Sequence, residues 1–211
     1  MKKIVIFGAG GLGREVQWLI ERINERKVSW EMMGYIDDGM DKGTIINGYK
    51  VLGGTDFLKQ YNEPIYVVCA IGSATTRKRI VEEISGLEMV YFPNLIDPSV
   101  KMSDFVQLGK GNIICAGTIL TVNIRIEDFC IINLDCTIGH DDILDSFVTI
   151  YPSVNISGNV HIGRCSELGT GTQIIQGIKI KEDSIIGAGS VVVKDLEESG
   201  TYVGAPVKII K

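Results

Sequence analysis

Histidine is rare in this chain, and one of its two copies stands beside two carboxylates. His140 precedes Asp141 and Asp142 in the run T-I-G-H-D-D at 137–142. An adjacent acid can orient an imidazole ring and support it as a general base. The alternative for His140 is a solvated corner residue, and the other histidine, His161, is expected to be a plain surface residue. For His140 the neighbouring acids favour catalysis.

A second candidate site is the glycine-rich run G-A-G-G-L-G at 8–13, which follows a short β-branched run. Glycines let the backbone approach a phosphate, and a helix N-terminus offers unpaired N–H groups. Asp37 follows at about the distance where an acidic residue would hold a ribose. The pattern favours nucleotide binding, and a tight turn without a ligand is the alternative.

The elements that must position this loop alternate between strand and helix. Apolar runs and helical spacing predict strands at 3–7, 30–36 and 65–71 and helices at 14–24 and 76–85. Strand, helix and strand in this order predict a small parallel sheet with βαβ connections, about half of a full dinucleotide-binding domain.

The second half of the chain repeats every six residues. Fifteen positions, six apart from 108 to 192, hold only isoleucine, leucine or valine, and glycine often follows them. Because side chains on a strand alternate with a period of two, six residues per side return the same residue type to the same inward position. The pattern predicts a solenoid with aliphatic columns on its axis and a corner at each glycine or polar residue.

These motifs, in this order, resemble the bacterial hexapeptide-repeat sugar acyltransferases of the sialic acid O-acetyltransferase and UDP-4-amino-sugar N-acetyltransferase type. The resemblance implies an α/β plus β fold: a small Rossmann-like nucleotide-sugar domain at 1–92, then a left-handed parallel β-helix at 96–211. It also implies three hexads per coil, and a homotrimer with active sites between adjacent subunits.

The resemblance also implies roles for single residues. His140 matches the catalytic base, and Asp141 matches the acid that raises its basicity. The residues implied to hold the nucleotide sugar are Gly10, Gly11, Leu12, Asp37, Asp38 and Gly72. Those implied to contact acetyl-CoA are Thr149, Thr170 and Ala188, with Lys208 near a phosphate. Many relatives have histidine where this chain has Leu12 and Thr149.

The expected function is direct transfer of an acetyl group from acetyl-CoA to an amino or hydroxyl group of a nucleotide-activated sugar, in the synthesis of bacterial surface glycans. One alternative, an NAD-dependent oxidoreductase, accounts for the glycine loop but leaves the solenoid unexplained. The other is a solenoid that binds without chemistry. A metal enzyme of the γ-carbonic anhydrase type is not expected, because it needs three histidine ligands.

Composition excludes other classes. The net charge of −5 implies no basic face, so nucleic acid is not an expected partner. No apolar run approaches the length of a membrane span or a signal-peptide core. Five cysteines form no CxxC pair, which predicts reduced thiols in a cytoplasmic protein.

Overall fold

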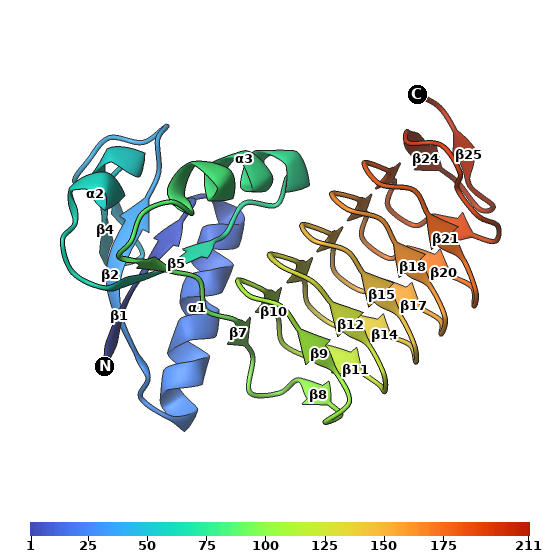
Figure 1. Cartoon of the computed structure of the whole chain (residues 1–211), viewed down its shortest axis with the longest axis horizontal. Coiled ribbons are helices and arrows are strands. Elements are labelled where there is room, and N and C mark those ends of the chain that lie inside the picture. The colour runs from blue at the N-terminus through green and yellow to red at the C-terminus, as the bar shows by residue number, and fades with distance from the viewer. The chain divides into compact units, whose positions relative to one another are not determined.

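The computed structural model describes all 211 residues, and their contacts divide the chain into two compact units. Unit 1 comprises Met1–Gly72 and Thr76–Pro98, and unit 2 comprises Ser73–Thr75 and Ser99–Lys211. Figure 1 shows the sheet and helices of unit 1 in blue to green, and the coils of unit 2 in green to red. The bounds 1–92 and 96–211 drawn from the sequence stay a prediction.

Unit 1 is built on a six-stranded sheet in the order β3-β4-β2-β1-β5-β6. Its strands are β1 Lys2–Phe7, β2 Trp30–Ile36, β3 Ile45–Ile46, β4 Tyr49–Gly53, β5 Ile65–Cys69 and β6 Val90–Tyr91. The helices of the chain are α1 Gly11–Arg26, α2 Thr55–Gln60 and α3 Ala74–Ile84. All strand pairs are parallel except β3 with β4, as the βαβ order predicts.

The core of unit 1 explains which residues form these elements. Ile4, Val5 and Ile6 of the central strand are fully buried, because a parallel strand covered on both faces needs a continuous apolar run. Helix α1 begins at Gly11, earlier than the predicted residue 14, because the last glycines of the loop already belong to its first turn. Gly13 is buried there, and a Cβ atom on it would overlap the carbonyl of Gly8.

The segment between β2 and β5 contains a hairpin and a short helix that the sequence analysis did not predict. Strands β3 and β4 are joined by Asn47 and Gly48, with φ of 46° and 87°. Two positive φ angles are the requirement of a tight two-residue hairpin loop, and Asn-Gly is its preferred sequence. The Asn-Gly pair was therefore a usable signal. Helix α2, of six residues, is too short for helical spacing to show.

Unit 2 is a left-handed parallel β-helix whose strands have two residues each. They are β8 Lys101–Met102, β9 Gln107–Leu108, β10 Ile113–Ile114, β11 Ile119–Leu120, β12 Arg125–Ile126, β13 Ile131–Ile132, β14 Thr137–Ile138, β15 Ile143–Leu144, β16 Thr149–Ile150, β17 Asn155–Ile156, β18 His161–Ile162, β19 Glu167–Leu168, β20 Gln173–Ile174, β21 Lys179–Ile180, β22 Ile185–Ile186 and β23 Val191–Val192. Strand β7, Leu95–Ile96, precedes them. After β23 come β24 Thr201–Val203 and the antiparallel β25 Lys208–Ile209.

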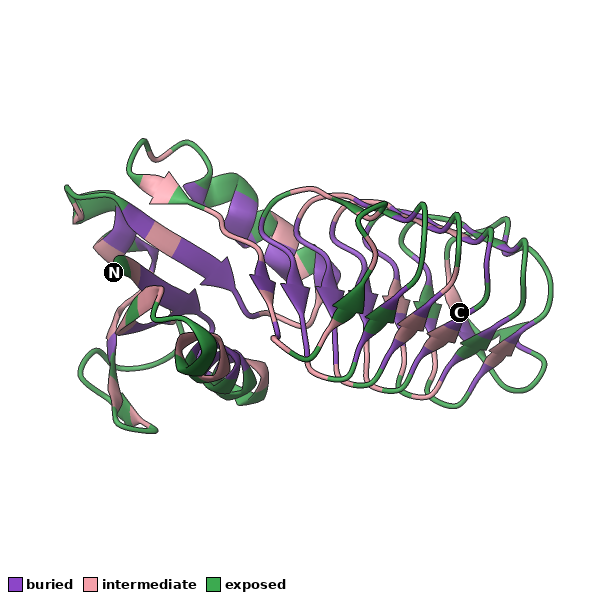
Figure 2. Cartoon of the chain, turned by 90° about the horizontal axis from the view of Figure 1, so that it is seen from below, coloured by how far each residue is buried: buried purple, intermediate pink, exposed green.

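The strands form three sheets, one for each side of a triangular coil. The sheets contain, in order, β24-β22-β19-β16-β13-β10, then β23-β20-β17-β14-β11-β8, and β21-β18-β15-β12-β9. Ile114 lies beside Ile132, three hexads later, which confirms three hexads per coil. The inward residues from 114 to 192 are all buried, and Figure 2 shows buried residues in purple recurring from coil to coil.

The corners of the coils differ from the expectation. From 108 to 186, the chain turns at a left-handed residue three places after each inward one, such as Asn123, Phe129 and Asp141, with φ of 57°, 57° and 63°. The glycines that directly follow an inward residue do something else. A Cβ atom on Gly169 would lie 2.6 Å from the backbone nitrogen of Ala188 in the next coil. These glycines therefore let successive coils approach closely.

The helices and the cysteines agree with two expectations drawn from the composition. No helix is long and apolar enough to span a membrane. All five cysteines are buried, and none forms a disulfide. Burial raises the pKa of the Cys69 thiol to about 12 and that of Cys136 to about 11, so both stay protonated and unreactive.

Candidate active site

The glycine loop of unit 1 lies at the carboxyl edge of the sheet, where β1 ends. Strand β1 has β2 on one side and β5 on the other, so this edge is the switch point at which such sheets bind ligands. No side chain caps the N-terminus of α1, and no acidic residue lies in its first turn. The first N–H groups of this helix therefore suit an anion such as a phosphate.

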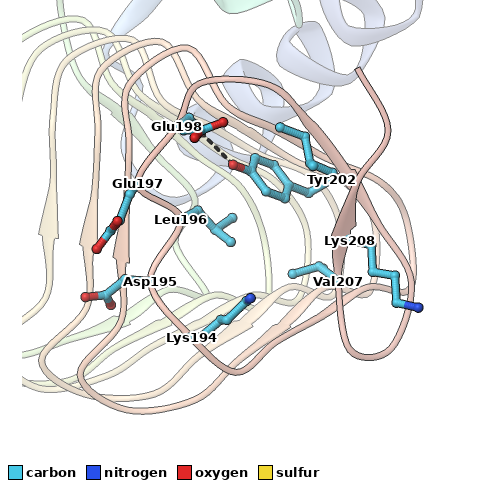
Figure 3. Close-up of a pocket in the computed structure, with 9 residues that line it drawn as sticks. Lys194, Asp195, Leu196, Glu197, Glu198, Tyr202, Val207 and Lys208 are labelled. Atoms are coloured by element: carbon cyan, nitrogen blue, oxygen red, sulfur yellow. Dashed lines mark hydrogen bonds between the residues drawn. The ribbon is translucent and has the colours of Figure 1, made fainter.

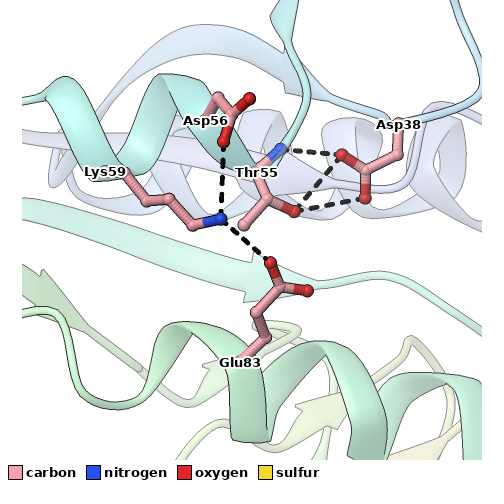
Figure 4. A network of polar contacts seen from close by, with 5 residues as sticks. All are labelled: Asp38, Thr55, Asp56, Lys59 and Glu83. Atoms are coloured by element: carbon pink, nitrogen blue, oxygen red, sulfur yellow. Dashed lines mark hydrogen bonds and ion pairs between the residues drawn. The ribbon is translucent and has the colours of Figure 1, made fainter.

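The two acids after β2 accept hydrogen bonds from backbone N–H groups around this site. Asp37 accepts a hydrogen bond from the N–H of Ala9 at 2.9 Å through one oxygen, and from the N–H of Gly39 at 2.9 Å through the other. Asp38 accepts from the N–H of Thr55 at 2.8 Å. Asp37 therefore fixes the glycine loop, and Asp38 caps the start of α2 (Figure 4).

Other polar contacts in Figure 4 are peripheral. Lys59 lies 3.4 Å from Asp56 and 3.2 Å from Glu83, and all three side chains are exposed. Such surface pairs contribute at most about 1 kcal/mol. The pair with Asp56 lies within α2, and the pair with Glu83 links α2 to α3. Neither pair involves Asp37 or Asp38, which stay the acids predicted for the site.

Gly72 reaches the same edge of the sheet, since it follows β5. The guanidinium of Arg77 donates hydrogen bonds to the carbonyls of Ile71 at 2.6 Å and Gly72 at 3.1 Å. Arg77 is only 1% exposed. The sequence does not point to Arg77, because its spacing on the helix does not distinguish a buried arginine from an exposed one. Of the predicted residues, Gly10 and Gly11 are exposed, and Leu12 and Gly72 are half-buried.

His140 lies at a corner of the β-helix, between β14 and β15, as the sequence predicts. Its Nδ1 is 2.8 Å from Asp141 Oδ2, and both side chains are about half exposed. Asn123, from the preceding coil, donates to Asp141 Oδ1 at 3.1 Å. The bonds from His140 and Asn123 lower the pKa of Asp141. A charged acid is therefore held against Nδ1, which leaves Nε2 as the nitrogen that can accept a proton.

Two further residues complete this corner, of which only Asp142 was named from the sequence, as a neighbouring acid without a role of its own. Gly158, in the next coil, lies against the imidazole of His140, where a Cβ atom would overlap Nε2. Asp142 is 1% exposed and accepts hydrogen bonds from backbone N–H groups on both sides of the corner. The signal for Gly158 was its position three hexads after His140, which the period itself supplies.

His161 also has an acidic partner, although we expected a plain surface residue. Its Nε2 is 2.9 Å from Asp145 Oδ1, and its side chain is 44% exposed. It lies on β18, whereas His140 lies at a corner. The two histidine–acid pairs are thus separate features of the solenoid.

Two of the three residues expected to contact acetyl-CoA lie at a different corner from His140, and the third lies on a strand. Thr170 and Ala188 are exposed and occupy the same corner in successive coils, since the N–H of Gly189 donates to the carbonyl of Thr170 at 2.8 Å. Thr149 is only 1% exposed and lies on β16. The structure therefore brings two of these three residues together.

A pocket of about 660 Å³ lies at the C-terminal end of the solenoid. Lys208 and Lys194 line it together with Glu197 and Glu198, and Tyr202 donates to the carbonyl of Glu198 at 2.7 Å (Figure 3). Lys208 lies there and not at the corner of His140. No group of three or more His, Cys, Asp or Glu side chains is placed to hold a metal ion.

Comparison with known proteins shows relatives that match both units. Residues 3–84 match the PglD N-terminal domain. The chain is 31% identical over 187 residues to GDP-perosamine N-acetyltransferase from Escherichia coli O157:H7, which covers 87% of this chain and 82% of that protein.

Two solved structures have the same fold along the whole chain. One is the acetyltransferase domain of PglB from Neisseria gonorrhoeae FA1090 in complex with acetyl coenzyme A, with 30% identity, 99% coverage of each chain and a TM-score of 0.89. The other is PerB from Caulobacter crescentus in complex with CoA and GDP-perosamine, with 28% identity, coverage of 100% and 98%, and a TM-score of 0.90. Because the relatedness extends over both units, this chain belongs to the hexapeptide-repeat sugar acetyltransferases, and acetyl-CoA is its acetyl donor.

Proposed function

We propose that the chain acetylates the amino group of a sugar activated as a nucleoside diphosphate, with His140 as the general base, in the synthesis of bacterial surface glycans. The observation that carries this proposal is the His140–Asp141 pair at the corner of the β-helix, with 2.8 Å between Nδ1 and Oδ2. The relatives that act on or bind GDP-perosamine support an amino group over a hydroxyl group as the acceptor.

The chemistry needs only one base. The sugar amine attacks the thioester carbonyl, its nitrogen–carbon bond forms as the carbon–sulfur bond breaks, and His140 Nε2 takes the proton from nitrogen. Asp141 stabilises the imidazolium, and CoA leaves as a thiolate that takes up a proton. Because no acyl-enzyme forms, the buried cysteines have no part in the reaction. Positioning the two substrates supplies most of the remaining acceleration, about 7–11 kcal/mol.

Unit 1 provides the binding site for the nucleotide sugar. The diphosphate would lie against the uncapped start of α1 at Gly10, Gly11 and Leu12. Asp37 and Asp38, together with Gly72, would form the walls of that site. Leucine at position 12 supplies an apolar contact and no hydrogen bond to the ligand.

The position of the CoA residues supports a homotrimer with active sites between subunits. Thr170 and Ala188 occupy the corner between the sheets of β16 and β17, whereas His140 occupies the corner between those of β14 and β15. Within one coil these two corners are adjacent, and one side of the triangle, six residues long, separates them. A second copy can bring its Thr170 corner to the His140 corner of the first, with Lys208 toward a phosphate of CoA. Thr149 remains a prediction from the resemblance alone.

A panel of 4-amino sugars, presented free and as UDP, GDP and dTDP conjugates, tests this function. We expect release of free CoA thiol and gain of one acetyl group, by mass spectrometry, for a nucleotide conjugate and not for the free sugar. Acetylation of the free sugar at the same rate would contradict the role of unit 1. Absence of transfer to every amine, with transfer to a sugar hydroxyl, would overturn the N-acetyl assignment.

A further inference from the structure

Asp142 is a buried acid two residues from His140, and the chemistry above does not use it. Its Oδ2 accepts a hydrogen bond from the N–H of Gly139 at 3.0 Å, and its Oδ1 accepts from the N–H of Val160 at 2.8 Å. Gly139 directly precedes His140, and Val160 belongs to the next coil. One carboxyl group therefore connects the start of the catalytic corner to the coil above it.

The position of Asp142 in its hexad makes this acid exceptional. The equivalent residues of later hexads include Val148, Val154 and Val160, all buried in the solenoid. The first hexad has Asn112 there, whose Oδ1 accepts from the N–H of Cys130 at 2.7 Å, as Asp142 accepts from Val160. An amide can therefore make the contact with the next coil. The contact with Gly139 is what the second carboxyl oxygen of Asp142 adds.

We propose that Asp142 is a positioning residue for His140, whose carboxylate holds the corner that presents the imidazole by binding the N–H groups of Gly139 and Val160. This inference rests on the proposed role of His140 as the base. A buried charge is costly unless it is hydrogen-bonded, and a valine would fill the same place without that cost. The acid therefore has a use that the packing of the column does not explain.

The ionised form is the one that serves both bonds, since two donors face two oxygens. Burial raises the pKa of Asp142 to about 7, although the N–H groups of Val160 and Gly139 act to lower it. Of the nearby charges, His140 lowers this pKa and Asp141 raises it. The coils before and after place Ile124 and Val160 at the equivalent position, and neither side chain carries a charge. We expect the corner to be held above pH 7 and loosened below it.

Three variants test the proposal on the full chain, with acetyl-CoA and the best acceptor of the panel above. Asp142→Val places valine at this hexad position, as at Val148 and Val154, and removes both acceptor oxygens. Asp142→Asn keeps an oxygen for Val160, as Asn112 does for Cys130, but offers no acceptor to Gly139. Asn112→Val is the matched control, because it removes a bond between coils in a different hexad. The pH profile of kcat and the melting temperature are measured for each.

We expect Asp142→Val to melt at or above the temperature of the native chain, with kcat lower by about tenfold or more, since a small misplacement of a catalytic group is costly. Asp142→Asn is expected to have intermediate kcat and to lose the ionisation near pH 7. Asn112→Val is expected to melt earlier with unchanged kcat. Should Asp142→Val fail to fold, Asp142→Asn decides. An unchanged kcat and pH profile in the folded Asp142 variants would overturn this inference. Full turnover by His140→Ala in the same assay would instead overturn the proposed function.

Discussion

The imidazole of His140 lies against the backbone of Gly158, which leaves no room for a side chain between the two coils. A Cβ atom on Gly158 would overlap Nε2 and lie about as close to the neighbouring ring carbons. Nε2 is the nitrogen proposed to take the proton. The absence of a side chain at Gly158 therefore determines the position that this nitrogen can occupy.

Gly158→Ala is therefore expected to move the imidazole and to lower kcat by about 100-fold, as a displacement of roughly 1 Å can do. The melting temperature should change little, because an exposed ring can rotate away at low cost. Gly86→Ala is the control, since nothing lies within 4 Å of a Cβ atom there. Steady-state kinetics on both variants check this. A native kcat for Gly158→Ala would mean that the ring position is not critical.

Asp141→Asn is expected to lower kcat by about 10–100-fold while the fold is kept. Asparagine tolerates the left-handed backbone that φ of 63° requires at this position, so the change removes only the charge beside Nδ1. Bonds from His140 and Asn123 lower the pKa of Asp141, so the charge is present throughout the neutral range.

Asp183→Asn is the matched control, since Asp183 has φ of 56° at the same hexad position, although it lies at another corner of a later coil. Its kcat should be native. Equal losses in the two variants would show that the backbone corner, and not the charge at position 141, is what matters.

Asp37→Ala is expected to raise the KM for the nucleotide sugar by about 10-fold or more, because the N–H of Ala9 loses a charged acceptor and the glycine loop is released. The KM for acetyl-CoA should stay the same. Asp41→Ala, at an exposed position in the same loop region, should leave both constants unchanged. If only the KM for acetyl-CoA rose, the glycine loop would bind acetyl-CoA and not the nucleotide sugar, which would contradict the proposal.

The period of six predicted the solenoid well, because each inward position from 114 to 192 depends only on burial in a repeating column. It also predicted that His140 lies at a corner. It did not predict that Asp142 is buried, since the same hexad position holds valine, serine or asparagine elsewhere, and an acid is rarely buried. The contacts of Gly158 and Asn123 with the catalytic pair are made between coils, so they follow from the stacking of coils and not from local spacing.

In unit 1, β1 and β5 were predicted because their runs are apolar, and β2 was predicted from a mostly apolar run that ends at Asp37, Asp38 and Gly39. The hairpin of β3 and β4 was missed because its strands are short and half exposed, and only the Asn47-Gly48 pair marks it. The role of Asp37 in holding the nucleotide stays a prediction, and the bonds of its two oxygens to the N–H groups of Ala9 and Gly39 were not predicted. Such a bond across 28 residues cannot be derived from a pattern within one element.

The stability of the chain should depend on pH through Asp142. The carboxyl has an ordinary pKa of 3.8 when unfolded and about 7 when folded. Between these values the folded chain binds a proton that the unfolded chain has released, so the free energy of unfolding falls as the pH rises from about 4 to 7. Asp142→Asn removes this slope. Denaturant unfolding at pH 5 and pH 8 should show that the variant gains stability relative to the native chain at the higher pH. A constant difference would contradict the raised pKa.

The central claim is that His140 accepts the proton when the acetyl group leaves acetyl-CoA. The most direct measurement compares His140→Ala with the native chain under saturating acetyl-CoA and nucleotide sugar, following thiol release and acetylated product, with acetyl-CoA binding measured by calorimetry. We predict that the variant binds acetyl-CoA with native affinity and that its kcat falls by about 100-fold or more. Native turnover by a variant that binds both substrates would contradict the assignment of His140 as the base.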